Sequence, residues 1–254
     1  MTTVVYDGSF DGLLTSIFEI YEYKFPEVML APEATLQHGL FGNQHPVTTD
    51  EKKAERVWKG FKQKVSPEAV QQVYKSWLSE QPGMDYTIYS YLKYAFESKT
   101  SIEKDYSHPA VLIISDTAKK VHREKHRMEA FIRFQLTKDQ LYFAIIEPDF
   151  DVLPLIKKHF EARYADQRWM VYDARRRYGL YYDLEKVDTV NVNFEETNQS
   201  GKYISAIYDE KEELSQKLWQ RYFASVNIKA RRNMKLHIQH MPLRYWKYLT
   251  EKQP

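Results

Sequence analysis

The stretch that decides the fold runs from Met128 to Asp183 and reads MEAFIRFQLTKDQLYFAIIEPDFDVLPLIKKHFEARYADQRWMVYDARRRYGLYYD. Within it, Glu129–Leu136 places alternate apolar side chains on one face, which is the period-two pattern of a half-buried strand. Leu141–Ile146 is almost entirely apolar, as expected of a central strand that is covered on both faces. A turn at Lys138-Asp139 would join these two strands, so the stretch is predicted to begin with a hairpin.

The second half of the stretch predicts a helix followed by two more strands. Asp149 and Asp151 are candidate N-caps, and apolar residues then recur at helical spacing at Val152, Ile156, Phe160 and Tyr164. Trp169–Tyr172 and Tyr178–Tyr182 are aromatic, β-prone runs. The resulting ββαββ unit predicts an α+β fold with a mostly antiparallel sheet and a helix on one face.

Composition bounds the class of protein. The chain has 254 residues, 43% hydrophobic and 28% charged, which is typical of a globular protein that can bury a sizeable core. Its net charge of +2 creates no global field that demands a polyanionic partner, so only the distribution of charge can indicate one. The chain has no cysteine, which excludes a disulfide, a catalytic thiol and an iron–sulfur cluster held by this chain. The sequence shows no signal segment and no apolar run long enough to span a membrane, so we expect a cytoplasmic protein.

The remaining segments suggest a single α+β domain over residues 1–254. Four helical runs between residues 50 and 126 predict a helical subdomain, with start signals such as Ser66-Pro67-Glu68. Residues 128–194 form the predicted sheet core, including a last strand at Val187–Phe194. Residues 209–254 form a C-terminal segment that is rich in basic and aromatic residues.

The N-terminal turn Asp7–Gly12 lies between a predicted strand, Thr2–Tyr6, and a predicted helix, Leu13–Tyr23. Ser9 or Asp11 is placed to cap this helix. A strand, a glycine turn and a helix N-terminus also describe an anion site, although the full phosphate-loop pattern is absent. A simple capped turn and an anion site both remain open.

The C-terminal segment carries the most informative charge pattern. From Leu214 to Thr250 there are eight Lys or Arg and no Asp or Glu, with aromatic residues interleaved. Guanidinium groups suit phosphates and flat rings suit unstacked bases, so this pattern predicts a nucleic-acid groove. The predicted binding residues are Arg231, Arg232, Asn233, Lys235, His237, Gln239, His240, Arg244, Tyr245 and Trp246. The alternative is that the rings are core and the charges form a solvated face.

Two other basic clusters extend this prediction. Three adjacent arginines, Arg175, Arg176 and Arg177, repel one another, which suggests either an anionic partner or neutralisation by Asp173 and Asp183. A second cluster lies at the end of a predicted helix and offers Arg123, His126 and Arg127. For this cluster the alternative is strong, because cations at a helix C-terminus are favoured by the helix dipole alone.

Metal and acid–base sites are weakly indicated. His122 and His126 are four residues apart on a predicted helix but lack a third ligand, so no metal site is predicted. Five carboxylates lie near turns and could serve acid–base or Mg²⁺ chemistry, although capping explains most of them: Asp7, Asp11, Glu147, Asp149 and Asp151.

Several long motifs resemble a bacterial family of probable DNA-metabolism proteins of unknown function. They are Val5-Tyr6-Asp7-Gly8-Ser9-Phe10-Asp11-Gly12-Leu13-Leu14, His126-Arg127-Met128-x-x-Phe131-x-Arg133-Phe134, Tyr164-x-x-Gln167-x-Trp169-x-x-Tyr172-Asp173-x-x-Arg176, Trp219-x-x-Tyr222-Phe223 and Arg231-Arg232-Asn233-x-Lys235-x-His237-x-Gln239-His240-Met241-Pro242-x-Arg244-Tyr245-Trp246. Members of that family are encoded beside a radical-SAM protein or are fused to a uracil-DNA-glycosylase domain. The resemblance implies DNA repair or modification and supplies no catalytic residues.

Together these patterns favour a nucleic-acid-binding accessory protein that presents DNA to a radical-SAM protein or a uracil-DNA-glycosylase domain. No cofactor of its own is expected. Two alternatives remain: a stand-alone enzyme that acts on DNA through carboxylates such as Asp7 or Asp11, and a protein–protein adaptor without DNA affinity.

Overall fold

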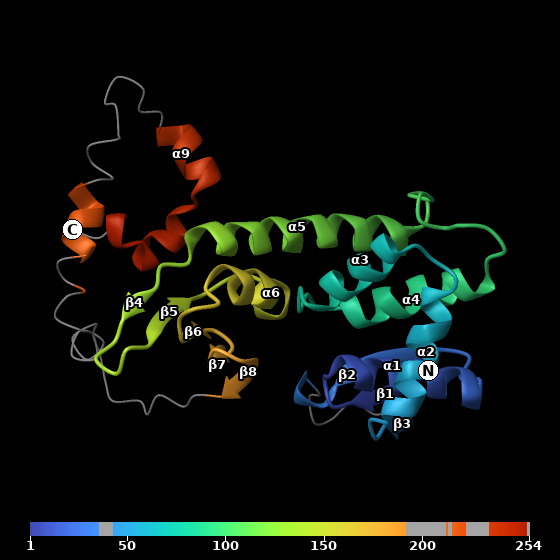
Figure 1. The fold of residues 1–254 in the computed structure, drawn as a ribbon. Helices are drawn as coiled ribbons and strands as arrows, with labels where there is room; N and C mark the ends of the chain where they lie inside the picture. The colour runs from blue at the N-terminus through green and yellow to red at the C-terminus, as the bar shows by residue number, and fades with distance from the viewer. Residues whose placement is uncertain (36–42, 192–211, 213–214, 222–233, 253–254) are drawn as a thin grey trace. The chain divides into compact units, whose positions relative to one another are not determined.

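The computed structural model describes residues 1–35, 43–191, 212, 215–221 and 234–252. The chain divides into two compact units, Met1–His122 and Arg123–Pro254, here called unit one and unit two. Figure 1 shows the order of the elements along the chain. None of the helices in the described ranges combines the length and the apolar content that a bilayer crossing needs.

Unit one contains a small parallel sheet with the strand order β2-β1-β3. Strand β1 (Thr2–Tyr6) is followed by helix α1 (Phe10–Tyr23), which crosses over to the parallel strand β2 (Val28–Pro32). The predicted first strand and helix are thus confirmed. Residues 43–46 form β3 (Asn43–Pro46), which pairs in parallel with β1. Between β2 and β3 lies a short 3₁₀ helix, η1 (Glu33–Thr35).

The predicted helical runs are confirmed as α2 (Glu51–Lys62), α3 (Pro67–Trp77), α4 (Met84–Glu97) and α5 (Pro109–Phe131). Local signals explain their starts. Asp50 caps α2 by accepting hydrogen bonds from the Lys52 and Lys53 backbone N–H groups. Ser66 caps α3, and Pro67 occupies its first turn. The apolar faces of α1, α2, α4 and the start of α5 share one core.

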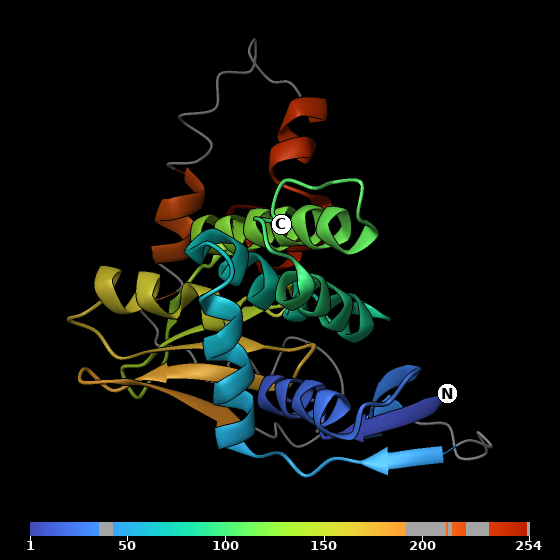
Figure 2. The same ribbon diagram turned by 90° about the vertical axis from the view of Figure 1, so that its right-hand side faces the viewer.

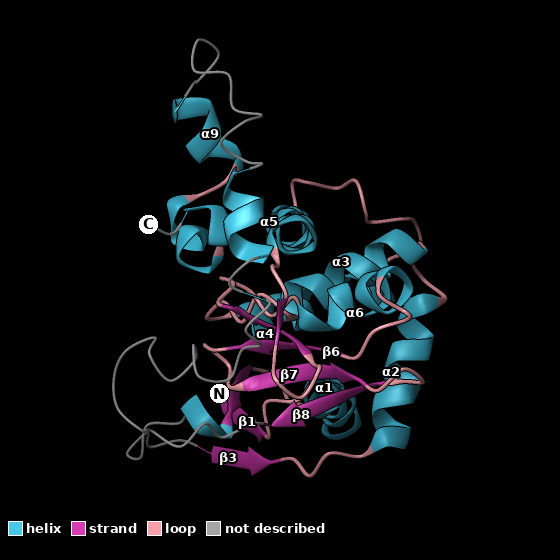
Figure 3. Ribbon diagram, turned by 60° about the vertical axis from the view of Figure 1, so that its left-hand side comes forward, coloured by secondary structure: helices cyan, strands magenta, loops and turns pink. Residues whose placement is uncertain are grey.

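Unit two is built on a five-stranded sheet with the order β4-β5-β6-β7-β8. The strands are β4 (Gln135–Leu136), β5 (Tyr142–Ile146), β6 (Trp169–Asp173), β7 (Tyr178–Tyr182) and β8 (Val187–Asn191). Only β5 and β6 pair in parallel, joined by the crossover helix α6 (Leu153–Arg163), and the other pairs are antiparallel. Figures 2 and 3 show α6 against one face of this sheet and β6, β7 and β8 side by side. The α+β class with a mostly antiparallel sheet is therefore confirmed.

Two local predictions in this unit were wrong. Residues 129–131 belong to α5 rather than to a strand, because Lys125 and Glu129 pair at 2.6 Å with helical spacing and Met128 and Ile132 are both buried, four residues apart. Only residues 135–136 of the predicted first strand are extended. The N-cap of α6 is Val152 without a side-chain bond, and Asp149 and Asp151 have other partners.

The C-terminal part of unit two is helical where it is described. Residues 215–221 form a helical segment, followed by α9 (Met234–His240) and two 3₁₀ helices, η3 (Leu243–Tyr248) and η4 (Thr250–Lys252). The predicted last strand is confirmed over residues 187–191, and residues 192–194 lie outside the described ranges.

Candidate functional site

The loop that carries the three adjacent arginines is organised by Asp173, the last residue of β6. Its fully buried carboxylate accepts hydrogen bonds from the Arg175 and Arg176 backbone N–H groups at 2.9 and 3.1 Å. The Arg176 guanidinium pairs with it at 2.9 Å, and only 9% of that side chain is exposed. Asp173 is therefore the counter-ion expected from the sequence. Asp183 instead accepts from the Glu185 and Lys186 N–H groups in the next turn.

Arg244 lies in the same neighbourhood as this loop, because both bind Asp149. The Asp149 carboxylate pairs with Arg244 Nη2 at 2.8 Å, and its backbone carbonyl accepts from Arg175 Nη1 at 3.2 Å and from Arg176 Nη2 at 3.3 Å. We call Glu124, Asp149, Arg175, Arg176 and Arg244 the Asp149 cluster. The structure thus brings Arg244 together with the arginine loop.

Two of the arginines in the Asp149 cluster, Arg176 and Arg244, are nevertheless paired with acidic residues of the same unit. Glu124, with 1% of its side chain exposed, accepts from Arg244 Nη2 at 3.0 Å, from the Asp149 N–H at 3.0 Å and from the Tyr245 hydroxyl. Tyr245 is buried, and burial followed by the hydrogen bond to Glu124 raises the pKa of its hydroxyl. Arg176, Arg244 and Tyr245 therefore hold unit two together, while Arg175 and Arg177 remain exposed.

The other predicted residues are dispersed. Arg231, Arg232, Asn233 and the His237 side chain lie outside what the structure describes. On α9, exposed side chains belong to Lys235, Gln239 and His240. The Trp246 indole donates to the Met241 carbonyl at 3.0 Å. On α5, Arg123 and His126 are exposed, whereas Arg127 is near Glu124 at 3.7 Å.

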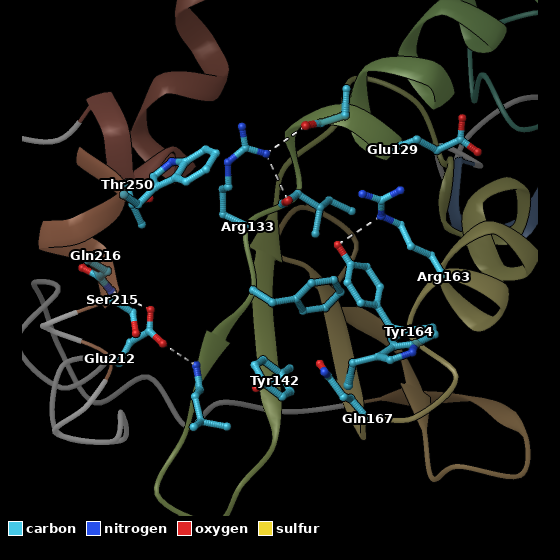
Figure 4. Close-up of a pocket in the computed structure, with 16 residues that line it drawn as sticks. Glu129, Arg133, Tyr142, Arg163, Tyr164, Gln167, Glu212, Ser215, Gln216 and Thr250 are labelled. Atoms are coloured by element: carbon cyan, nitrogen blue, oxygen red, sulfur yellow. Dashed lines mark hydrogen bonds between the residues drawn. The ribbon is translucent and has the colours of Figure 1, made fainter. Parts of the chain in front are cut away.

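A cavity of about 620 Å³ opens in unit two, and we call it the aromatic cavity. Five rings line it: Phe134, Tyr142, Tyr164, Trp169 and Trp219. Figure 4 shows that Arg163 and Tyr164 come from the end of α6 on one side, Ser215 and Gln216 come from the helical segment on the other, and Arg133 and Tyr142 lie between them. Its volume falls within the range of small-molecule sites, roughly 300–1,000 Å³.

Hydrogen bonds between distant segments fix one wall of the cavity. Arg133 Nη2 donates to Glu251 Oε1 at 2.8 Å, and the Trp219 indole donates to Glu251 Oε2 at 3.0 Å. Glu212 Oε2 accepts from the Leu136 N–H at 3.0 Å, as Figure 4 shows. Through Glu251, the helical segment 215–221 is fastened to Arg133, just after α5, and Glu212 is fastened to β4.

Three residues that line the cavity carry polar groups with few or no partners among the described residues. The Arg163 side chain is exposed and forms no ion pair with a described residue; its Nε approaches the Tyr164 hydroxyl at 3.4 Å. The Gln167 amide group makes no hydrogen bond within the described ranges. The Trp169 indole N–H is buried without a hydrogen-bond partner among them. Such an unsatisfied donor costs about 1–3 kcal/mol, which a ligand acceptor would recover.

Strand register separates the aromatic cavity from the Asp149 cluster. Tyr142 faces Trp169 at the start of the parallel strands, and Ile146 faces Asp173 at their end. Four steps of roughly 3.3 Å along a strand put the two ends roughly 13 Å apart. Unit two therefore carries two distinct polar centres.

The N-terminal turn is a capped turn in which both carboxylate oxygens of Asp7 accept hydrogen bonds. Ser9 caps α1, and Asp7 Oδ1 accepts from the Ser9 N–H and hydroxyl at 2.9 and 2.6 Å. Thr49 donates to Asp7 Oδ2 at 2.8 Å. Burial raises the pKa of Asp7, but these hydrogen bonds outweigh it and the net shift is downward. The carboxylate occupies the place where an anion would bind.

Two further candidate carboxylates, Glu147 and Asp151, also have partners. Glu147 accepts from Lys247 and, at 2.9 Å, from the Tyr248 hydroxyl, and Asp151 accepts from the Tyr178 hydroxyl. Hydrogen bonds from Lys247 and Tyr248 lower the pKa of Glu147. Across the described ranges, no three His, Asp or Glu side chains gather as metal ligands.

The aromatic cavity was not predicted from the sequence, although many of its residues belong to the motifs that were identified. Arg133, Phe134, Tyr164, Gln167, Trp169 and Trp219 all stand in the motifs that carry the family resemblance. Periodicity assigned these residues to the scaffold of strands and helices. The sequence feature that could have indicated the cavity is that the polar residues Arg133 and Gln167 lie beside aromatic residues within those motifs.

The chain matches a known protein family. A family model described as a domain of unknown function, DUF4130, matches residues 82–251. The matched range includes every residue of the aromatic cavity and of the Asp149 cluster. No curated protein matches the chain significantly.

Proposed function

Since the chain belongs to the DUF4130 family of domains of unknown function, we propose on chemical grounds that it is a nucleic-acid-binding accessory protein in DNA repair or modification. It would hold DNA and present it to a partner enzyme. The proposal assigns binding to unit two, where the predicted basic residues and the aromatic cavity lie.

The observation that supports this proposal most is a set of exposed arginines that form no ion pair within the described part of the chain. Arg123, Arg163, Arg168, Arg175 and Arg177 are exposed and form no ion pair with any residue that the structure describes. Arginines in this state suit the bidentate binding of phosphates. Because Arg163 also borders a cavity lined by rings, a charged backbone and an unstacked base could be held side by side.

The partner is proposed from the family resemblance and from chemistry. That resemblance points to a radical-SAM protein or a uracil-DNA-glycosylase domain. The chain has no cysteine to ligate an iron–sulfur cluster, so the cluster of a radical-SAM reaction would belong to the partner. The accessory protein would supply binding and orientation of the DNA.

A protein–protein adaptor without DNA affinity is the second candidate, and exposed apolar side chains favour it. Leu218, Trp219 and Leu243 are each at least 40% exposed in unit two. Exposed apolar side chains of this size are used at protein interfaces when they form a patch. A stable complex with the partner enzyme, combined with no DNA binding by either the protein or the complex, would select this candidate.

Fluorescence anisotropy with labelled single- and double-stranded DNA tests the proposal over a salt series, for the protein alone and with its partner. If about four to eight phosphates are neutralised, log K falls with log salt at a slope of about −3 to −7. Binding with such a slope supports the proposal. No binding at about 50 mM salt, alone and with the partner, overturns it.

A further inference from the structure

We infer that the aromatic cavity is a binding site for a single unstacked nucleobase whose phosphate lies against Arg163. This inference rests on the proposed function and names the part of the nucleic acid that the cavity takes. It follows from the shape of the cavity, its open hydrogen-bonding groups and the sign of its free charge.

The walls of the cavity select a flat ligand. Trp169 and Tyr142 are neighbours in the register of β6 and β5, Tyr164 directly follows α6, and Trp219 belongs to the helical segment 215–221. Trp169 is held in place by stacking on Tyr182, with ring centroids 5.6 Å apart. A cage of rings on fixed elements suits a planar heterocycle, since every base offers an aromatic face.

The open polar groups require that the heterocycle carry hydrogen-bond acceptors and donors. The Trp169 N–H is buried without a hydrogen-bond partner among the described residues and can only donate, so a ligand group that reached it would have to be an acceptor such as a base carbonyl or ring nitrogen. The Gln167 amide can both donate and accept, which matches the mixed edge of a base. A purely apolar ligand would leave both groups unsatisfied.

The charge at the cavity selects an anion attached to this heterocycle. Of the two arginines that line the cavity, Arg133 is bound to Glu251, whereas Arg163 has no acidic partner among the described residues. The lining carboxylates are engaged: Glu129 pairs with Lys125 at 2.6 Å, and Glu212 accepts from the Leu136 N–H. A flat heterocycle with an attached phosphate is a nucleotide, either free or within a strand.

The test compares two labelled strands of twelve nucleotides, one of thymidines and one wholly abasic, on the full chain. We expect wild type to bind the thymidine strand about tenfold more tightly or better, because stacking of bases on rings supplies affinity. Gln167→Ala and Trp169→Phe should each cut that preference at least threefold, and circular dichroism confirms that the variants fold. Arg168→Ala is the matched control, because Arg168 is exposed and does not line the cavity. The Arg168→Ala substitution should weaken the binding of both strands by the same factor and leave the preference for the thymidine strand unchanged.

The outcomes separate this inference from the proposed function. Equal binding of the two strands by wild type, or a preference that survives both Gln167→Ala and Trp169→Phe, overturns the base site and leaves DNA binding intact. Binding of thymidine 5′-monophosphate without binding of either strand supports a nucleotide site and overturns the proposed function. Failure to bind the mononucleotide and both strands overturns both.

Discussion

The Arg133 guanidinium and the Glu251 carboxylate are 118 residues apart in the chain and 2.8 Å apart between Nη2 and Oε1. Glu251, with 1% of its side chain exposed, also accepts the Trp219 indole N–H at 3.0 Å. One buried carboxylate thus joins the end of the chain, the helical segment 215–221 and the residues after α5. The aromatic cavity depends on this junction, because Arg133 and Trp219 are both part of its wall.

Glu251→Gln is expected to lower the free energy of unfolding by about 2–4 kcal/mol, because it leaves Arg133 partly buried without its counter-ion. Urea denaturation followed by tryptophan fluorescence measures the change. Asp116→Asn is the matched control: it removes an exposed pair with Lys119 at 3.3 Å and should cost less than about 1 kcal/mol. Equal effects of the two substitutions would show that the Glu251 junction adds no more stability than a surface pair.

The Glu251 junction also predicts a pH dependence. Burial raises the pKa of Glu251, but hydrogen bonds from Arg133 and Trp219 outweigh burial and the net shift is downward. A depressed folded-state pKa contributes stability above the unfolded value of about 4.3. That stability is lost as pH falls through the folded value. Urea midpoints between pH 7 and 3 should therefore fall more steeply for wild type than for Glu251→Gln, and parallel curves would contradict the assignment.

Gly12→Ala should destabilise unit one, although alanine normally favours a helix by about 1 kcal/mol. A Cβ on Gly12 would lie 2.2 Å from Asp7 Oδ1 and 3.0 Å from the Thr49 hydroxyl, so the capped turn would have to open. Gly60→Ala in α2 is the matched control, since its Cβ meets nothing closer than 3.6 Å. The midpoint temperature of thermal unfolding should fall for Gly12→Ala and should stay the same or rise for Gly60→Ala. A stabilised Gly12→Ala variant would refute the packing of this turn.

Neighbouring arginines in the β6–β7 loop should behave differently. Arg176→Ala leaves the fully buried Asp173 carboxylate without its ion pair and should cost about 3–5 kcal/mol in unfolding free energy. Arg177→Ala removes an exposed side chain and should change stability by less than about 0.5 kcal/mol. Paired urea titrations decide this, and a similar loss for both would mean that Arg176 is no more structural than Arg177.

Local patterns were enough to predict much of the fold. Helical periodicity and start signals located α1 to α4, and aromatic, β-prone runs located β6 and β7. The polar sequence of β3, Asn43–Pro46, carries no strand signal, and it becomes a strand only through pairing with β1. The end of α5 was missed because the pattern of Glu129–Leu136 fits a strand as well as a helix, and tertiary packing decided between them.

The candidate site could be predicted only in part, because it is made by contacts between distant residues. Three adjacent arginines at 175–177 and their neighbour Asp173 suggested a local ion pair, which the structure contains. The pairing of Arg244 with Glu124, 120 residues away, has no local signal. The aromatic cavity likewise joins Arg133, Tyr164 and Trp219 from three separate segments, so periodicity within one segment could not reveal it.

The most direct test of the account is the salt dependence of single-stranded DNA binding for wild type, Arg163→Ala and Arg56→Ala. Arg56 is an exposed arginine on α2 of unit one, which the proposal leaves out of the DNA surface. The account predicts that Arg163→Ala makes the slope of log K against log salt shallower by about 0.7, one phosphate contact on a single strand, and that Arg56→Ala leaves it unchanged. An unchanged slope for Arg163→Ala, or no wild-type binding at about 50 mM salt, would contradict it.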